Sequence, residues 1–217
     1  MSVRVKICGI TRAEDARVAV AAGADALGFM FWEESPRRLS VEAAAAICRG
    51  LPPFVSKVGV FVNAEPADIR EAIAACRLEA VQFHGDETPE FCAQFARPVI
   101  RAFRVRGPET LAVLAGYATA AWLLDSHVAG QRGGTGATFH WAWAAKAVKL
   151  GRPVILAGGL TPENVAAAVR EVRPYAVDVS SGVEARPGRK DADKVRAFVR
   201  AAKGAAAAFG EAEAQGP

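Results

Sequence analysis

The sequence lacks the long apolar runs of a membrane protein and the paired cysteines of a metal site or a disulfide framework. No apolar run reaches the roughly 18 residues that a membrane-spanning helix needs. The four cysteines, Cys8, Cys48, Cys76 and Cys92, form no CxxC pair and show no Cys/His spacing typical of zinc ligands. No signal-like segment precedes the first apolar run. These absences predict a cytoplasmic protein with reduced thiols and no membrane contact.

Clusters of positive charge and of histidine are also missing. The 27 basic and 23 acidic residues give a net charge of +4, and the basic residues are scattered along the chain. This distribution argues against a nucleic-acid partner and suits a small anionic substrate. His84, His127 and His140 stand apart from any cluster of carboxylates, so we expect no metal site.

What the sequence does contain is a repeated alternation of short apolar runs and longer Ala-rich amphipathic segments. The short runs are almost continuously apolar, as expected for parallel strands that are buried on both faces. There are eight of them: Val3–Cys8, Ala26–Phe31, Val55–Phe61, Ala80–Phe83, Val99–Phe103, Trp122–Asp125, Val154–Ala157 and Ala176–Val179.

Helix start and stop signals lie between these runs. We expect Thr11 to cap one helix in a capping box with Glu14, and Ser40 to precede a second helix at Val41–Arg49. Prolines at predicted helix starts and glycines at predicted helix ends are Pro66, Pro89, Pro162, Gly23, Gly50 and Gly151.

Eight strand–helix units in one chain predict a single α/β domain, a parallel eight-stranded (β/α)8 (TIM) barrel over residues 1–204. A doubly wound sheet would share the same local pattern. The strand number, the lack of a GxGxxG motif and the absence of a linker favour the barrel. We expect the Ala/Gly/Glu-rich residues 205–217 to form a frayed tail without a function.

In a barrel of this kind the active site lies at the carboxyl ends of the strands. Gly158-Gly159 follows the seventh run, and Ser180-Ser181-Gly182 follows the eighth. Paired glycines let backbone N–H groups approach an anion, and a helix N-terminus adds a favourable dipole. These two turns therefore predict a phosphate site, the alternative being that they are only tight turns.

Cys8 and Asp125 are the last residues of the first and sixth runs, on the predicted catalytic rim. Cys8 is a candidate catalytic thiol, although a buried cysteine can equally be inert packing. An ionised Asp125 after an apolar run needs a partner or a raised pKa, unless it is a helix N-cap. Arg37 after the second run could bind a substrate carboxylate, whereas Arg38 is expected to be a solvated surface residue.

Seven short sequence segments occur in the order typical of phosphoribosylanthranilate isomerases. On these segments the chain resembles this family from about Val3 to Gly204. The opening segment is Lys6-Ile7-Cys8-Gly9-Ile10-Thr11. The others are Gly59–Asn63, Gln82–Gly85, Leu124–Ser126, Gly133–Gly136, Ala157–Val165 and Asp178–Glu184.

The resemblance implies a cofactor-free and metal-free Amadori rearrangement of N-(5-phosphoribosyl)anthranilate in tryptophan biosynthesis. It implies that Cys8 is the general base, that Asp125 is the general acid, and that Arg37 holds the anthranilate carboxylate. We also place His84 and Asp178, which belong to two of the shared segments, among the substrate-binding residues. The remaining substrate-binding residues are Gly158, Gly159, Ser180, Ser181 and Gly182, and the protein is expected to be a monomer or a homodimer.

Two other functions remain open at this point. Another phosphosugar enzyme of the same fold, similar to ribulose-phosphate epimerases, would need more histidines at strand ends than this sequence has. A non-catalytic phosphosugar-binding barrel is compatible with the fold. The glycine-rich segment Ser126–Thr138 is predicted to close over the substrate.

Overall fold

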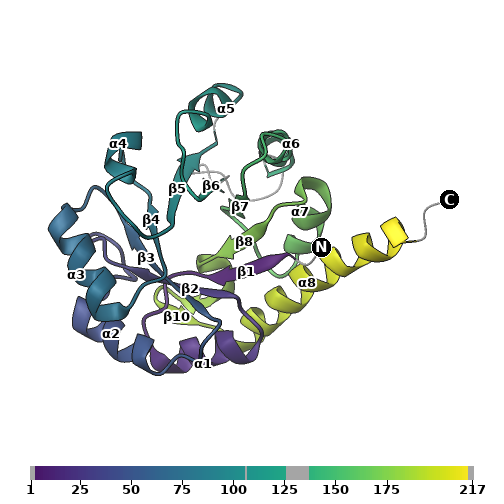
Figure 1. Ribbon diagram of the computed structural model, residues 1–217. Coiled ribbons are helices and arrows are strands. Elements are labelled where there is room, and N and C mark those ends of the chain that lie inside the picture. Colours follow the sequence, from purple (N-terminus) through teal and green to yellow (C-terminus); the bar gives the residue numbers. More distant parts are fainter. Residues whose placement is uncertain (1–2, 106, 126–136, 215–217) are drawn as a thin grey trace.

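The strands of the computed structural model, which describes residues 3–105, 107–125 and 137–214, close into one barrel (Figure 1). Each strand pairs in parallel with its sequence neighbours, and β1 closes the barrel against β8. The predicted (β/α)8 barrel is therefore confirmed. The strands are β1 (Arg4–Ile7), β2 (Ala26–Met30), β3 (Ser56–Phe61), β4 (Ala80–Phe83), β5 (Val99–Arg104), β6 (Ala121–Asp125), β7 (Val154–Ala157) and β8 (Ala176–Val179).

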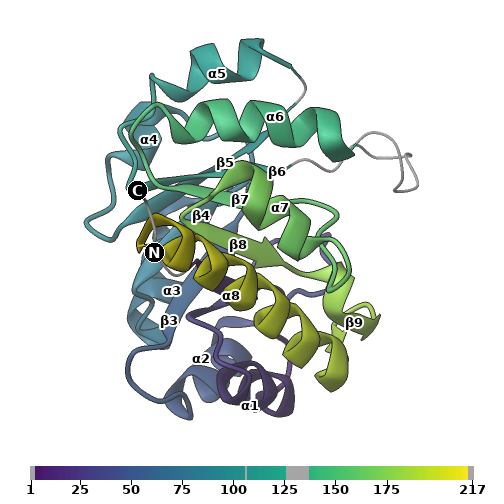
Figure 2. The same cartoon turned by 90° about the vertical axis from the view of Figure 1, so that its right-hand side faces the viewer.

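The helices surround the strands on the outside of the barrel, and α7 and α8 lie side by side there (Figure 2). A short 3-10 helix and a two-stranded hairpin follow β8. The helices are α1 (Ala13–Ala21), α2 (Val41–Arg49), α3 (Pro66–Cys76), α4 (Pro89–Cys92), α5 (Glu109–Leu114), α6 (Ala137–Val148), α7 (Val165–Val172) and α8 (Ala192–Ala214); the 3-10 helix is η1 (Ser181–Val183), and the hairpin is β9 (Glu184–Arg186) with β10 (Arg189–Lys190).

Several predicted helix signals are confirmed and two are wrong. The Ser40 side chain accepts a hydrogen bond from the Ala43 amide at the start of α2, and Pro66 and Pro89 begin α3 and α4. Thr11 does not cap α1, because its hydroxyl donates to the Gly188 carbonyl and the helix begins at Ala13. Pro162 lies in the turn before α7, which begins at Val165.

Alternate side chains of each strand face opposite sides of the barrel wall. The outward side chains, such as Ile7, Leu27 and Val177, join the large core beneath the helices. The inward side chains form a smaller apolar cluster of Val, Ile, Leu and Ala residues. Burying both faces of every strand explains why the strand sequences are almost continuously apolar.

The chain beyond Gly204 differs from its prediction, because α8 continues to Ala214. Alanine and glutamate favour helix over coil, and this propensity accounts for the helical extension of a segment that the sequence indicated as frayed. Among the described residues, no helix combines the length and the apolarity needed to cross a membrane.

Candidate active site

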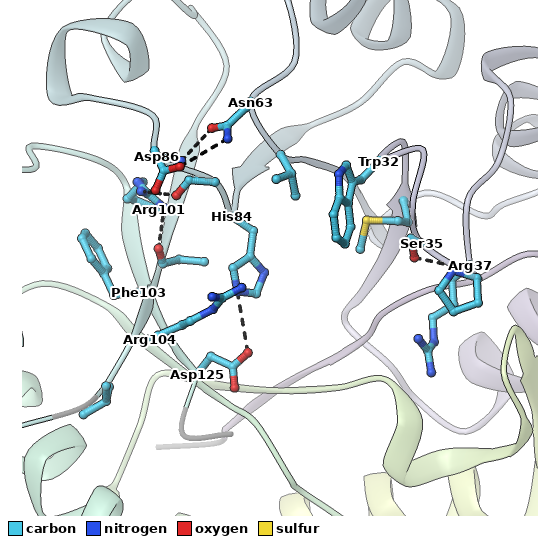
Figure 3. A pocket seen from close by; sticks show the side chains of 16 residues that line it. Trp32, Ser35, Arg37, Asn63, His84, Asp86, Arg101, Phe103, Arg104 and Asp125 are labelled. Atoms are coloured by element: carbon cyan, nitrogen blue, oxygen red, sulfur yellow. Dashed lines mark hydrogen bonds and ion pairs between the residues drawn. The ribbon is translucent and has the colours of Figure 1, made fainter. Parts of the chain in front are cut away.

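A cavity of about 1070 Å³ lies at the carboxyl ends of β2 to β6 (Figure 3). Its lining includes three predicted site residues, Arg37, His84 and Asp125. They come from segments far apart in the sequence, and the barrel brings them to one opening. The other lining residues are Met30, Trp32, Ser35, Pro36, Val62, Asn63, Gly85, Asp86, Arg101, Ala102, Phe103, Arg104 and Val105.

Asp125 ends β6, and its carboxylate lies 3.6 Å from Nε2 of His84, which follows β4. Burial lowers the pKa of His84 despite the neighbouring carboxylate, so the imidazole is neutral near pH 7. The residues that directly follow Asp125 lie outside the described ranges, and the described part of α6 begins at Ala137.

A buried arginine holds the loop that carries His84. The Arg101 guanidinium donates to the carbonyl oxygens of Phe83 at 3.1 Å and of Gly85 at 2.7 Å. The Glu87 carboxylate in turn accepts from the amides of Gly85 and Asn63, at 2.9 and 2.8 Å. These hydrogen bonds fix the backbone on both sides of His84, and the sequence alone did not single out either charged residue.

Cys8 lies just after β1, and only 5% of its surface is exposed. Its amide donates to the Val179 carbonyl at 2.8 Å, so the thiol is anchored to the end of β8. Burial raises the pKa of Cys8, while the ammonium groups of Lys6 and Lys190 act in the opposite direction. The thiol is therefore protonated in most molecules at neutral pH.

Gly28 on β2 makes room for the Cys8 side chain. A Cβ atom at this position would lie 2.7 Å from Cys8 Sγ and 3.1 Å from Cys8 Cα. Because one of these neighbours is backbone, rotating the thiol would not relieve the clash. We expect Gly28→Ala to displace Cys8 and to reduce kcat by more than tenfold in an activity assay. A thermal melt of the same variant shows whether the protein is still folded, which separates displacement of Cys8 from unfolding. Normal turnover in a folded Gly28→Ala protein would contradict this role.

The Arg37 side chain, which lines the cavity, is held by an ion pair with Glu184. Its Nε and Nη2 donate to the two carboxylate oxygens of Glu184, at 2.8 and 2.6 Å. The hydrogen bond to Glu184 raises the pKa of Arg37, and Lys190 donates to the same carboxylate at 2.9 Å. Glu184 thus orients the guanidinium, a partner that the sequence did not reveal. Arg38 is exposed and pairs with Glu33, in agreement with its predicted surface position.

The two turns predicted to bind phosphate have the expected backbone geometry. Gly158 and Gly159 have φ values of 84° and 63°, a region that favours glycine. A Cβ atom on Gly182 would come within 1.9 Å of the Leu160 carbonyl oxygen. Ser181–Val183 forms the expected short helix, so the turns after β7 and β8 pack closely together. The close packing favours glycine at position 182.

Gly9 connects Cys8 to the other parts of the site. Its φ is 71°, and a Cβ atom there would lie 2.5 Å from Cδ of Arg37 and 3.0 Å from Oγ of Ser180. The end of β1 therefore adjoins both the Arg37 side chain and the turn after β8. The predicted base, the predicted carboxylate ligand and the predicted phosphate turn lie next to one another.

Three polar side chains occupy inward positions below this rim. Lys6 on β1 donates to Gln82 on β4 and to Asp178 on β8, each at 3.0 Å, and all three are buried. Asp178 was predicted from its sequence segment, whereas Lys6 and Gln82 were not singled out. A signal for Lys6 was present, because a buried charge at an inward strand position is costly and needs a partner.

The predicted closing segment Ser126–Thr138 lies outside the described residues, apart from the start of α6. The described residues contain no group of three or more His, Cys, Asp or Glu side chains arranged to hold a metal ion.

Comparison with known proteins supplies the family. The family model for N-(5'-phosphoribosyl)anthranilate (PRA) isomerase matches residues 5–201. The chain belongs to the PRA isomerase family. It is therefore an isomerase, and the family predicted from the sequence segments is confirmed.

The relatives match over almost their whole length. The N-(5'-phosphoribosyl)anthranilate isomerase of Geobacter sulfurreducens is 59% identical over 93% of this chain and 99% of its own. The isomerase of Thiobacillus denitrificans is 55% identical over 94% of this chain and 99% of its own. The crystal structure of the Thermotoga maritima isomerase matches with a TM-score of 0.87 and 46% identity, covering 93% and 99% of the two chains.

One similar structure contains a ligand. It is a phosphoribosylanthranilate isomerase in complex with reduced 1-(o-carboxyphenylamino)-1-deoxyribulose 5-phosphate, with a TM-score of 0.85 and 45% identity. It covers 93% of this chain and 99% of its own.

Proposed function

We propose that this protein converts N-(5-phosphoribosyl)anthranilate into 1-(2-carboxyphenylamino)-1-deoxyribulose 5-phosphate, an aldose-to-ketose isomerisation in tryptophan biosynthesis. The observation that carries the proposal is that a family member has Cys8 directly after β1 and Asp125 at the end of β6, both at carboxyl ends of barrel strands, with Asp125 lining the cavity. A thiol and a carboxyl group at separate strand ends can serve as base and acid without neutralising each other.

In the first step, the Asp125 carboxylic acid donates its proton to the furanose ring oxygen. The C1′–O bond breaks, and the nitrogen lone pair forms the C1′=N bond of an iminium ion. Neutral His84, 3.6 Å from the carboxylate, contributes a polar contact without adding a charge next to that cation. A dry cavity would protect the iminium from hydrolysis.

In the second step, the positive nitrogen acidifies the C2′ proton, which the Cys8 thiolate removes. The C–H electron pair forms the C1′=C2′ bond of an enolamine, and the nitrogen becomes neutral. Protonation at C1′ with loss of the hydroxyl proton at C2′ then gives the ketone. Atoms and electrons balance within the substrate, so no redox cofactor takes part in this mechanism.

The turns after β7 and β8 are the proposed phosphate site. Gly158, Gly159, Ser181 and Gly182 would donate backbone N–H groups, with the hydroxyls of Ser180 and Ser181 nearby. The left-handed glycines and the start of η1 support this assignment, because both geometries expose amides to an anion. Asp178, at the end of β8 beneath these turns, is proposed to contact the sugar.

Arg37 is the proposed ligand of the anthranilate carboxylate, with Glu184 holding its guanidinium in place. We expect Arg37→Ala to weaken binding of a carboxylate-bearing product analogue by about 1.5–3 kcal/mol, the range for a hydrogen bond to a charged group. Arg38→Ala, which removes an exposed neighbour, is the matched control. Binding is measured by calorimetry.

A second analogue with an unsubstituted phenyl ring separates recognition from structural damage. Arg37→Ala should hardly change its affinity, because that analogue has no carboxylate to lose. Equal weakening of both analogues, or equal effects of Arg37→Ala and Arg38→Ala, would contradict the assignment.

A rate assay tests the proposed function itself. Purified protein is added to freshly made N-(5-phosphoribosyl)anthranilate, and substrate fluorescence and product formation are followed. We expect consumption far faster than the spontaneous breakdown of this labile substrate. Binding of the product analogue without acceleration would instead favour the non-catalytic phosphosugar-binding alternative.

We further propose that the protein is a monomer or a homodimer in the cytoplasm. One similar structure is described as mutually generated monomers of a dimeric phosphoribosylanthranilate isomerase from Thermotoga maritima, which supports a monomer or a homodimer for this chain. The cysteines Cys8, Cys48, Cys76 and Cys92 are free thiols, which supports the cytoplasm as its compartment.

A further inference from the structure

The interior of the barrel holds a buried cation, Lys6, next to Cys8, the thiol that is proposed to act as the base. Lys6 is two residues before Cys8, so both side chains point to the inside of the barrel. Both also border Gly28, where an added Cβ atom would lie 2.7 Å from Cys8 Sγ and 3.2 Å from Lys6 Cε. The Lys6 side chain is only 4% exposed, so water screens its charge poorly.

The Lys6 ammonium has two polar partners inside the barrel. An interior made only of apolar side chains would contain neither of them. Asp178 and Gln82 each accept a hydrogen bond from its ammonium at 3.0 Å. Although burial alone would lower the pKa of Lys6, its interactions with Asp178 and Cys8 raise it, so Lys6 carries a full charge at neutral pH. A cation is thus held in one orientation next to the thiol.

Charged side chains of both signs surround Cys8. Lys6, Lys190 and Arg37 are cations that interact with the thiol position, and Asp178 and Glu184 are the carboxylates paired with them. Among the groups whose charges shift the pKa of Cys8, Lys6 and Lys190 favour the thiolate and Asp178 opposes it. A further buried carboxylate, Asp15, accepts a hydrogen bond from the Lys190 amide at 3.0 Å.

We propose that Lys6 is a positioning residue whose ammonium, anchored by Asp178 and Gln82, stabilises the thiolate of Cys8. This inference rests on the proposed role of Cys8 as the base. It assigns Lys6 a function in the reaction although Lys6 itself does not touch the reacting atoms. Asp178 then has two opposing effects. It anchors the Lys6 ammonium, and its own negative charge opposes ionisation of the Cys8 thiol.

A thiolate titration tests the proposal without any substrate. Ultraviolet absorbance of the thiolate is recorded against pH for each protein, and the curve of its Cys8→Ser counterpart is subtracted. The variants are Lys6→Met, Asp178→Asn and the double substitution, with Lys57→Met as a control. Lys57 pairs with Glu79 away from Cys8, so removing it tests for a nonspecific effect of lost positive charge.

We expect the titration midpoint of Cys8 to rise in Lys6→Met and to fall in Asp178→Asn. At neutral pH the thiolate fraction of Lys6→Met should drop by about tenfold or more, as expected when an opposite charge close by is lost. The double substitution should lie between the two single variants, and Lys57→Met should titrate like the unmodified protein.

A purely structural role for Lys6 predicts a different pattern. Loosened packing would admit water, and relief of burial would lower the midpoint in both single variants. A midpoint that is unchanged or lower in Lys6→Met would overturn the proposal. If Lys6→Met does not fold, Lys6→Gln takes its place, because it removes the charge but keeps a hydrogen-bond donor for Asp178 and Gln82. An unchanged or lower midpoint in that variant overturns the proposal.

The titration separates this inference from the proposed function. Opposite shifts in the two variants, together with normal turnover of Cys8→Ser, would retain the Lys6 effect and reject Cys8 as the base. If both proposals hold, the pH at which kcat/KM reaches half its maximum should rise in Lys6→Met together with the thiolate midpoint. Alkylation of Cys8 by iodoacetamide, followed on the peptide that contains it, should slow in parallel.

Discussion

Cys8→Ser is expected to reduce kcat by about 10²–10⁴-fold, the range for loss of a general base. The serine side chain has nearly the same shape, so the buried position after β1 remains filled. Its hydroxyl is far too weak a base to take the C2′ proton at neutral pH. Affinity for the product analogue should change little, because the proposed phosphate and carboxylate ligands are other residues. A Cys8→Ser protein with more than about a tenth of the normal activity would contradict the mechanism, since general-base catalysis is worth far more than that.

The pH dependence of Cys8 reactivity follows from its burial. Burial raises the pKa of Cys8 above its ordinary value, and only the thiolate can accept a proton or react with an alkylating agent. The thiolate fraction, and with it the rate at which iodoacetamide alkylates Cys8, should therefore increase as the pH rises through neutrality toward the Cys8 pKa. An alkylation rate of Cys8 that is independent of pH between about 6 and 8 would be evidence against a titrating thiol at this position.

Asp125→Asn is expected to lower kcat by a comparable factor, about 10²–10⁴-fold. The amide preserves the volume at the end of β6 but cannot give a proton to the ring oxygen. Ring opening, rather than proton abstraction at C2′, should become the slow step. The decisive comparison uses an acyclic product analogue, whose binding should survive because its sugar is already open.

His84→Asn is the matched control for Asp125→Asn. His84 contacts the Asp125 carboxylate at 3.6 Å and lines the same cavity, but it is not assigned a proton-transfer role. Its substitution should reduce kcat less than that of Asp125. A larger loss in His84→Asn would move the acid role from the carboxylate to the imidazole.

The sequence predicted the barrel well because the strand pattern depends on burial that every strand shares. Inward and outward residues are both covered, so eight apolar runs stand out, and the observed strand ends differ from the predicted ones by about one residue. The capping box at Thr11 failed for a long-range reason. Its hydroxyl bonds to Gly188 in the hairpin after β8, a contact between segments that no local pattern contains.

The site was predicted unevenly for a related reason. Residues in recognisable turns, such as Gly158 and Ser181, could be proposed as phosphate ligands because such turns have a sequence signature. Lys6, Gln82 and Glu184 could not, because each acts through a partner on a distant strand or loop. The sequence alone did show one unusual feature, which is a lysine, Lys6, within an apolar strand.

The most direct test of the account is a crystal structure with the reduced product analogue bound. We expect its phosphate at the amides of Gly158, Gly159, Ser181 and Gly182, and its carboxylate at Arg37. The carbon that corresponds to C2′ should lie about 3–3.5 Å from Cys8 Sγ, a near-attack distance, with Asp125 on the opposite side of the sugar. A phosphate bound elsewhere, or a C2′ atom that Cys8 cannot reach, would contradict the acid–base pair on which the proposed function depends.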